Sequence, residues 1–131
     1  MVVDTSAMVA YLRGEPEADR ILARIEASGQ CIMSAMNVFE ARTVLNSRFG
    51  IGAAGDVDDF LHRIGFVVLP FDEGQAQAAF DAYRRFGKGS GSPARLNLAD
   101  CAAYALARTL GMPLLFKGDD FTHTDVPPAL A

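Results

Sequence analysis

The sequence has little of what marks secreted, membrane or disulfide-stabilised proteins. It holds two cysteines, Cys31 and Cys101, which are too few for a disulfide framework, so we expect reduced thiols and a cytoplasmic location. No run of about 18 apolar residues occurs, so we expect no membrane span. The opening residues, MVVDTSAMVAYLRGE, carry an early acid and no basic leader, so we expect no signal peptide.

Basic residues and cofactor motifs are also scarce. Twelve Lys and Arg against sixteen Asp and Glu give a net charge of −4, which argues against a sequence-blind nucleic-acid binder. Local basic residues and a carboxylate cluster for a metal both remain compatible with that charge. The pattern G-x-x-x-x-G-K-[ST] is not present, so a P-loop nucleotide enzyme is unsupported.

Zinc and thiol chemistry are unsupported as well. His62 and His123 show no ligand spacing with the two cysteines, so we expect both histidines at the surface. Cys101 adjoins Asp100 but has no basic partner to lower its pKa. We therefore interpret Cys101 as a packing residue and not as a nucleophile.

Short apolar runs alternate with amphipathic segments along the whole chain. Half of the 131 residues are hydrophobic, enough for one domain with a core, so we expect a single domain over residues 1–131. We expect strands at 1–3, 30–33, 66–71 and 114–116, with 125–127 as a candidate for a last one. Helices are expected at 7–12 (with Thr5-Ser6 as its start), 15–28, 35–49, 57–64, 73–86 and 98–110, with a break over 50–55. The alternation predicts an α/β sandwich with a mostly parallel sheet covered by helices on both sides.

Acidic residues collect where this fold would place a site. In an open parallel sheet, sites form beyond the carboxyl ends of the strands. Asp4 ends the first strand, the pair Asp119-Asp120 follows the strand at 114–116, and Glu40 and Asp100 fall in the first turns of helices that begin at the same edge. Gathered carboxylates repel one another unless a cation joins them. Mg²⁺ or Mn²⁺ is the natural choice, and a metal held by carboxylates suits phosphate-ester hydrolysis.

Each of these acids also has an ordinary structural explanation. Three segments have the form of a helix capping box: Asn97-x-x-Asp100, Asn37-x-x-Glu40 and Asp72-x-x-Gln75. An acid in a first helical turn gains about 0.3–1 kcal/mol from the helix dipole. We interpret Asp72 as a cap only, and Asp119-Asp120 alone could form an ordinary turn. For the others, capping and metal binding both stay open.

Four blocks of the sequence resemble a known family. MVVDTSAMVAYLRGEPEA, the Asn-x-x-Glu helix start at 37–40, LNLADCAAYALA and PLLFKGDDFTHTD are similar to the PIN-domain toxins of bacterial toxin–antitoxin pairs, the VapC family. The resemblance runs nearly end to end. It implies a three-layer α/β/α sandwich and a metal-dependent endoribonuclease that acts as the toxin of a VapBC-type pair. It also implies Mg²⁺ as cofactor, with Mn²⁺ able to substitute.

The resemblance carries the family's acids onto particular residues. They are Asp4, Glu40, Asp100 and Asp120, with Asp119 as a reserve ligand. Ser6 matches a small hydroxyl residue that could hold the first carboxylate or a metal-bound water. The implied reaction is in-line attack by metal-activated water, which leaves a 5′-phosphate and a 3′-hydroxyl.

Candidate RNA contacts follow from the same comparison. They are the basic residues Arg84, Arg85, Lys88, Arg95 and Lys117, for which a solvated surface is the alternative explanation. The chain departs from the family at Leu98-Ala99, where relatives often have an aromatic residue and a glycine. It also departs at the loop GKGSGSP, where relatives are often more basic or richer in histidine. The second departure weakens the expectation of RNA contacts by that loop.

The resemblance also implies partners. VapC toxins form homodimers and bind a VapB-type antitoxin through a groove beside the site, and helices between residues 7 and 25 could supply part of that groove. The alternative is that the apolar residues of those helices, Met8, Tyr11, Leu12, Ile21 and Leu22, face the core.

Two other functions were considered. A receiver-type phosphoacceptor domain would use Asp72 and Lys117, but Asp4 lacks the adjacent acid of that family, and Glu40 and Asp100 would have no role. A catalytically inactive PIN-like binding module is the second alternative. The complete set of acids argues against it, and an activity assay decides it.

Overall fold

The computed structural model describes residues 1–130, which build a four-stranded sheet at the centre of the molecule. The strands are β1 (Val2–Val3), β2 (Ile32–Ser34), β3 (Val67–Leu69) and β4 (Leu114–Leu115), in the spatial order β3-β2-β1-β4. All three strand pairings are parallel, with Val2 opposite both Ile32 and Leu114. The predicted parallel sheet is therefore confirmed.

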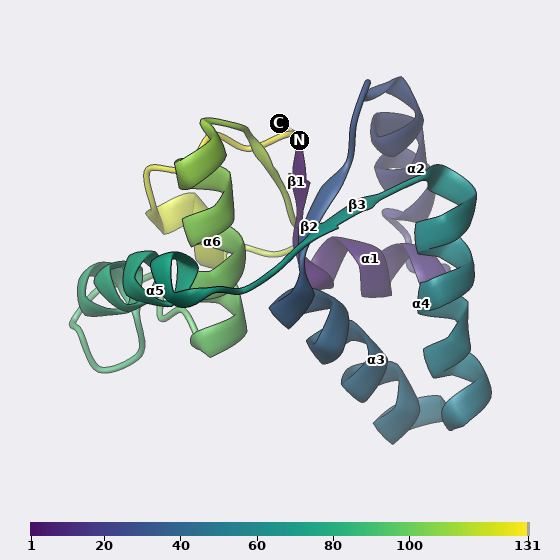
Figure 1. The fold of residues 1–131 in the computed structure, drawn as a ribbon, viewed down its shortest axis with the longest axis horizontal. Coiled ribbons are helices and arrows are strands. Elements are labelled where there is room, and N and C mark those ends of the chain that lie inside the picture. The colour runs from purple at the N-terminus through teal and green to yellow at the C-terminus, as the bar shows by residue number, and fades with distance from the viewer. Residues whose placement is uncertain (131) are drawn as a thin grey trace.

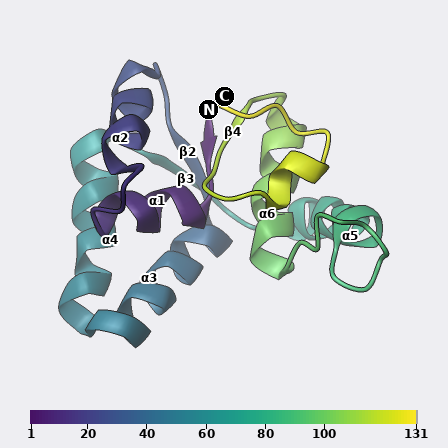
Figure 2. The ribbon, with the colours of Figure 1, turned by 180° about the vertical axis from the view of Figure 1, so that it is seen from behind.

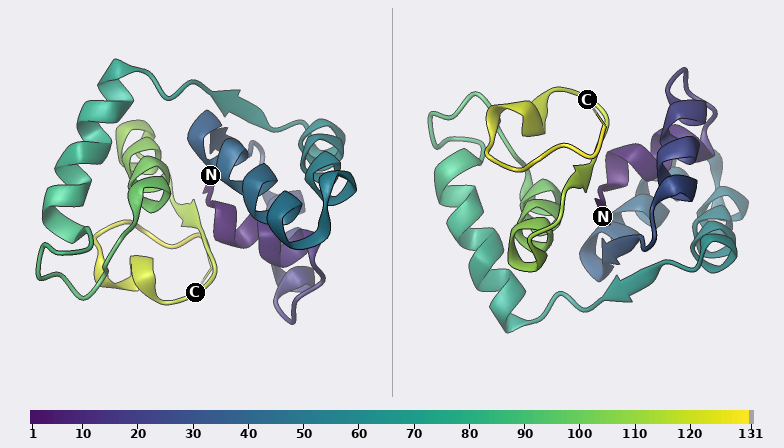
Figure 3. Two further views of the ribbon diagram at one scale, coloured as in Figure 1. Left: turned by 90° about the horizontal axis from the view of Figure 1, so that it is seen from below. Right: turned by 90° about the horizontal axis from the view of Figure 1, so that it is seen from above.

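Within the described part of the chain, six α-helices and one 3-10 helix surround the sheet. They are α1 (Thr5–Leu12), α2 (Ala18–Ala27), α3 (Ala35–Phe49), α4 (Ile51–Ile64), α5 (Glu73–Phe86), α6 (Leu98–Leu110) and the 3-10 helix η1 (Asp120–His123). Helices α1 to α4 lie on one side of the sheet, and α5 and α6 lie on the other (Figure 1, Figure 3). This is the predicted α/β/α sandwich. Within residues 1–130, no helix is long and apolar enough to cross a membrane.

The core is divided into two apolar clusters by the sheet. Successive side chains of a strand point to opposite faces, and β1 shows this directly. Val3 packs with Met8 and Phe60 in the cluster under α1 to α4, and Val2 packs with Tyr104 in the cluster under α5 and α6. Phe121 of η1 belongs to this second cluster, and Figure 2 shows η1 beside α6.

Two predictions about strands are wrong. Strand β3 was expected to be buried on both faces, but Val67 and Val68 are 36% and 41% exposed, because β3 is an edge strand that pairs only with β2. The other edge strand, β4, is buried, and its outer side is hydrogen-bonded to residues 127–129. Residues 125–127 form no strand. Leu114 makes a single bridge to Pro128, and its amide donates to the Pro127 carbonyl at 2.9 Å. Pro127 and Pro128 lack the N–H groups that a strand ladder needs.

The predicted helix break over residues 50–55 is too long. Only Gly50, with φ of 88°, separates α3 from α4, and α4 starts at the next residue. Gly52 and Gly55 lie inside α4. A glycine inside a helix costs about 1 kcal/mol relative to alanine, and the buried side chains of Val57 and Phe60 on the same helix offset that cost.

Candidate active site

Asp4 leaves the end of strand β1 as a buried carboxylate. It is 2% exposed and serves as the N-cap of α1. Its Oδ2 accepts hydrogen bonds from the amide of Ser6 at 2.9 Å and from the Ser6 hydroxyl at 2.6 Å. Its Oδ1 is buried and has no hydrogen-bond partner within the described residues. One oxygen of Asp4 is therefore held by the protein, while the other is left for a ligand.

Ser6 joins Asp4 to the turn that follows β4. Its Oγ donates to Asp4 and accepts a hydrogen bond from the backbone amide of Lys117 at 3.0 Å. Of the two roles considered for Ser6, the geometry matches the first, in which the hydroxyl holds the carboxylate.

Asp100 enters the site from the first turn of α6. Asn97 caps this helix: its Oδ1 accepts from the Asp100 amide at 2.8 Å, while Asp100 Oδ2 accepts from the Asn97 amide at 3.0 Å. The predicted capping box is confirmed. Asp72 likewise caps α5, through a bond from the Gln75 amide at 2.9 Å.

Glu40 lies in α3, where the capping prediction is wrong. The helix begins at Ala35 with Ser34 as its N-cap, whose hydroxyl accepts from the Met36 amide at 3.2 Å. Serine is as good an N-cap as asparagine, and Ser34 comes three residues earlier than Asn37. Glu40 therefore falls in the second turn of α3, one turn later than expected, and has no capping role.

Three predicted acids open into one pocket. Asp4, Glu40 and Asp100 line a pocket of about 280 Å³ together with Thr5, Ser6, Val9, Glu15, Val44 and Arg48. Helices α1, α3 and α6 supply most of these residues, and in Figure 1 all three helices begin at the same end of the sheet. The expected convergence is therefore confirmed for Asp4, Glu40 and Asp100, whereas Asp119 and Asp120 do not line this pocket.

The charges of these acids act on one another. Burial raises the pKa of Asp4 to about 7; the hydrogen bonds from Ser6 oppose the rise, and the charges of Asp100 and Glu40 add to it. Burial also raises the pKa of Asp100; the Asn97 amide opposes this, Glu40 and Asp120 add to it, and Lys88 lowers it.

The fourth predicted acid, Asp120, interacts with Asp100 through its charge. Asp120 is near enough to Asp100 for its charge to raise the pKa of that carboxyl. Asp119 is exposed, and its carbonyl accepts a hydrogen bond from the Thr122 amide at 3.0 Å at the start of η1. Asp120 is exposed as well, so its link to the pocket acids is this electrostatic interaction with Asp100.

The donor set fits a hard divalent cation. Its atoms are carboxylate oxygens, the ligands that such cations prefer. A cation would also give the unpaired Oδ1 of Asp4 a partner and would offset the mutual repulsion of the acids. Among residues 1–130, however, no three or more Asp, Glu, His or Cys side chains lie close enough together to hold a metal ion as they stand.

Among the charged residues of the pocket, the sequence prediction missed Glu15 and Arg48. Arg48 was detectable, since Glu40, Val44 and Arg48 recur every four residues and so share a face of α3. Glu15 follows the end of α1 and is hydrogen-bonded to the ammonium of Lys117. No local sequence pattern predicts the contact between Glu15 and Lys117.

The candidate RNA contacts separate into different environments. The Lys117 ammonium pairs with Glu15 and, at 3.5 Å, with Glu17. Lys88 is near enough to lower the pKa of Asp100. Arg84 and Arg95 are exposed. These positions make Lys88 and Lys117 the predicted basic residues that lie by the acids.

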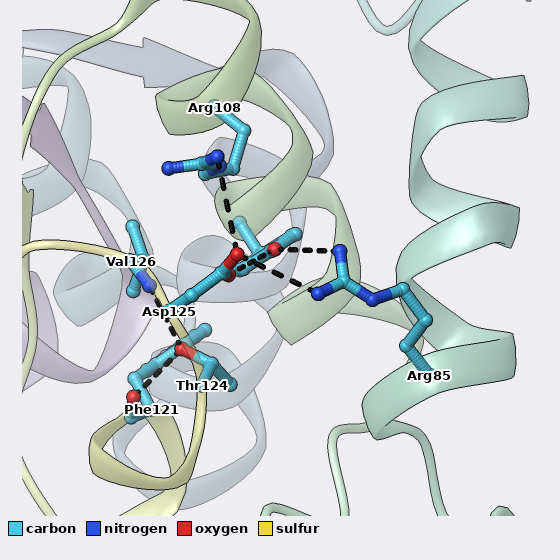
Figure 4. A network of polar contacts seen from close by, with 7 residues as sticks. Arg85, Arg108, Phe121, Thr124, Asp125 and Val126 are labelled. Carbon is cyan, nitrogen blue, oxygen red and sulfur yellow. Dashed lines mark hydrogen bonds and ion pairs between the residues drawn. The ribbon is translucent and has the colours of Figure 1, made fainter.

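Arg85 belongs to a network around Asp125 (Figure 4). Its guanidinium is 3.5 Å from the Asp125 carboxylate, and Arg108 approaches the same carboxylate at 3.9 Å. The Tyr104 hydroxyl donates to Asp125 as well. This network joins α5, α6 and the segment after η1, so Arg85 has a structural partner that the sequence did not reveal.

The remaining side-chain predictions hold. His62 and His123 are exposed. Cys101 is 1% exposed, and burial raises the pKa of its thiol to about 12, which suits a packing residue and not a nucleophile.

Comparison with known proteins agrees with the fold. Residues 1–127 match the family model of the PIN domain. The chain is 47% identical over 129 residues to the ribonuclease VapC42 of Mycobacterium tuberculosis, covering 98% of each chain. The chain therefore belongs to the PIN-domain family and, within it, to the VapC ribonucleases.

Solved structures share the fold. The crystal structure of the Mycobacterium tuberculosis toxin VapC20, titled a sarcin-ricin loop cleaving toxin, superposes with a TM-score of 0.79 at 20% identity over 95% of each chain. A toxin–antitoxin complex from Klebsiella pneumoniae gives a TM-score of 0.66 at 16% identity, over 92% of this chain and 88% of that chain.

The receiver-domain alternative is not supported. Asp72 is exposed and caps α5, while Lys117 pairs with Glu15 and Glu17. Neither residue is arranged as that alternative requires, and the family is a different one.

Proposed function

We propose that this protein is an endoribonuclease, the toxin of a VapBC-type toxin–antitoxin pair, and that it hydrolyses RNA phosphodiester bonds at the acidic pocket. The observation that carries the proposal is the convergence of Asp4, Glu40 and Asp100 on one pocket in a chain that is 47% identical to a VapC ribonuclease. The proposed RNA substrate and antitoxin partner support a further proposal, that it acts in the cytoplasm.

Asp4, Glu40, Asp100 and Asp120 are the residues that would hold the divalent ion, with Asp119 in reserve. Mg²⁺ is the proposed ion and Mn²⁺ its substitute. When bound, the ion supplies a water of lowered pKa and offsets negative charge on the leaving oxygen. Ser6 keeps Oδ2 of Asp4 engaged, so Oδ1 is the oxygen that is free for the ion.

Basic residues around the pocket would hold the RNA. Arg48 lines the pocket, and Lys88 is near Asp100. Lys117 is held beside the pocket by Glu15. A phosphate backbone that enters a pocket of acids needs such cations to offset the repulsion between like charges. The other predicted RNA contacts are less favoured than Arg48, Lys88 and Lys117, because none of them lines the pocket: Arg84, Arg85 and Arg95.

The test of the proposed function is cleavage of total bacterial RNA by the purified protein. It is run with Mg²⁺, with Mn²⁺ and with EDTA. We expect discrete products with either metal and none with EDTA. A folded protein that binds Mn²⁺ but yields no products in any condition would favour the inactive binding module instead.

The antitoxin site is proposed to be a groove between α1, α2 and α4. The groove has a volume of about 530 Å³, and its lining includes Tyr11, the buried Phe60, Arg63 and the three acids Asp19, Asp56 and Asp59. Such a lining suits a segment that carries both apolar and basic side chains. Of the apolar residues considered for this role, Met8 and Ile21 are buried in the core, whereas Tyr11, Leu12 and Leu22 are partly buried.

A homodimer is proposed through a second, apolar surface. Met36, Phe71, Phe80 and Leu98 line a groove of about 440 Å³, and Phe80 and Leu98 are 57% and 70% exposed. Exposed apolar side chains gathered in this way mark interaction surfaces. Light scattering tests this proposal: we expect the wild type to be a dimer and Phe80→Glu to be a monomer. The matched control Ile51→Glu changes an exposed apolar residue on α4 and should stay dimeric.

A further inference from the structure

Asn37 is a fully buried polar side chain that joins three segments of the fold. It lies on α3 and is 0% exposed. Its Nδ2 donates to the hydroxyl of Thr5 at 3.2 Å and to the backbone carbonyl of Ala99 at 3.0 Å. The Thr5 hydroxyl in turn donates to the backbone carbonyl of Asn37 at 3.2 Å.

Each segment that Asn37 joins carries one acid of the pocket. Thr5 follows Asp4 directly, and Ala99 directly precedes Asp100. Asn37 itself lies three residues before Glu40, which is about one turn of the same helix. One amide group therefore connects the backbones that present all three carboxylates.

Stability alone is a poor explanation for an amide at this position. The Oδ1 of Asn37 is buried and has no hydrogen-bond partner within the described residues. An unsatisfied buried acceptor carries a desolvation cost, which an apolar residue of similar shape would avoid. The benefit that offsets this cost is the fixed relation of α3 to Thr5 and Ala99.

We propose that Asn37 is a positioning residue for the metal site: it sets the spacing of Asp4, Glu40 and Asp100 without touching the ion or the RNA. The proposal rests on the proposed function, since it assigns a supporting residue to that site. Partners that orient ligand-bearing groups typically change metal affinity or activity by about 10- to 100-fold when they are removed.

Two variants test the role. Asn37→Leu keeps the approximate shape and removes both hydrogen bonds that Nδ2 donates. Thr5→Val removes one partner and leaves the bond to Ala99, so it serves if Asn37→Leu does not fold. The matched control is Val57→Ala, which shortens a buried side chain of α4 in the apolar core, outside the pocket. Circular dichroism first verifies that each protein is folded at the temperature of the assay.

The readouts are Mn²⁺ affinity by calorimetry, and kcat and KM for RNA. For Asn37→Leu we expect Mn²⁺ affinity and kcat each to fall about 10- to 100-fold with KM nearly unchanged; Thr5→Val should show a smaller loss of the same kind. Val57→Ala should lower the thermal midpoint and leave Mn²⁺ affinity unchanged.

A folded Asn37→Leu with the Mn²⁺ affinity and kcat of the wild type would overturn the positioning role. If only Thr5→Val folds, unchanged values in that variant would overturn it equally. A wild type that neither binds Mn²⁺ nor cleaves RNA would instead overturn the proposed site itself, and the inference with it.

Discussion

Asn97 and Asp100 bond to each other in both directions. The side chain of Asn97 accepts from the Asp100 amide at 2.8 Å, and the side chain of Asp100 accepts from the Asn97 amide at 3.0 Å. Asp100 also lines the acidic pocket. The same carboxylate therefore closes the start of α6 and belongs to the proposed metal site, so its two roles have to be separated by experiment.

Asn97→Ala separates the cap from the site. The variant removes the main capping side chain but keeps the Asp100 carboxylate. We expect the free energy of unfolding to fall by about 1 kcal/mol, measured by urea denaturation, with RNA cleavage retained. Loss of cleavage in a folded Asn97→Ala protein would mean that the cap is needed to place Asp100.

Asp4→Asn should stabilise the metal-free protein. A carboxylate at 2% exposure with one unpaired oxygen costs more free energy when it is ionised than an uncharged amide at the same place. We expect the free energy of unfolding without metal, measured slightly above neutral pH, to rise by about 1 kcal/mol or more. Added Mn²⁺ should raise the thermal midpoint of the wild type but not of the variant. A variant less stable than the metal-free wild type would contradict this explanation.

Asp125→Asn should weaken the protein in a pH-dependent way. The hydrogen bond from Tyr104, assisted by Arg108 and Arg85, holds the pKa of Asp125 below its usual value. A lowered folded pKa stabilises the fold above the unfolded pKa of about 3.9, and this contribution is lost as the pH falls through the folded value. The wild type should therefore be the more stable protein at neutral pH, and the difference should vanish in strong acid.

The size of this effect is limited by solvent. The Asp125 and Arg85 side chains are 45% and 59% exposed, so we expect less than about 1 kcal/mol from the pair. Thermal unfolding is compared across pH with Asp81→Asn, on the exposed surface of α5, as the control. A gap between wild type and Asp125→Asn that widens in acid would contradict the assigned direction of the pKa shift.

Arg48→Ala should weaken RNA binding more than Arg84→Ala. Arg48 lines the pocket, whereas Arg84 lies on the exposed last turn of α5. We expect Arg48→Ala to lower RNA affinity and to reduce the slope of log affinity against log salt by about 1. Fluorescence anisotropy in an Asp100→Asn background measures binding without cleavage. The reverse order of the two variants would move the RNA path to α5.

Periodicity and strand–helix alternation were sufficient to predict most of the fold. Helices α3, α5 and α6 have the predicted bounds, because each has a clear cap or glycine stop and an apolar face. Strand β3 is as apolar as the buried strands, but its exposure depends on its place at the edge of the sheet. A local sequence pattern does not encode that place.

The acids of the site were predictable from their positions relative to the expected strands and helices. Asp4 and Asp100 are at the ends of strands or the starts of helices, and the parallel topology brings these positions to one edge. Glu15, by contrast, reaches the pocket through its contact with Lys117, 102 residues away in the chain. Asn37 was visible but was misread as a helix cap, because its partners Thr5 and Ala99 are distant in sequence.

Sequencing of new 5′-phosphate ends tests the central claim most directly. Total bacterial RNA is treated with wild-type protein and with Asp100→Asn, each in Mg²⁺ and in EDTA. Asparagine keeps an oxygen that can accept from the Asn97 amide, so the variant should fold like the wild type. We predict discrete new ends with wild type and Mg²⁺ only. The same ends produced by folded Asp100→Asn, or by the wild type in EDTA, would contradict a metal-dependent ribonuclease at this pocket.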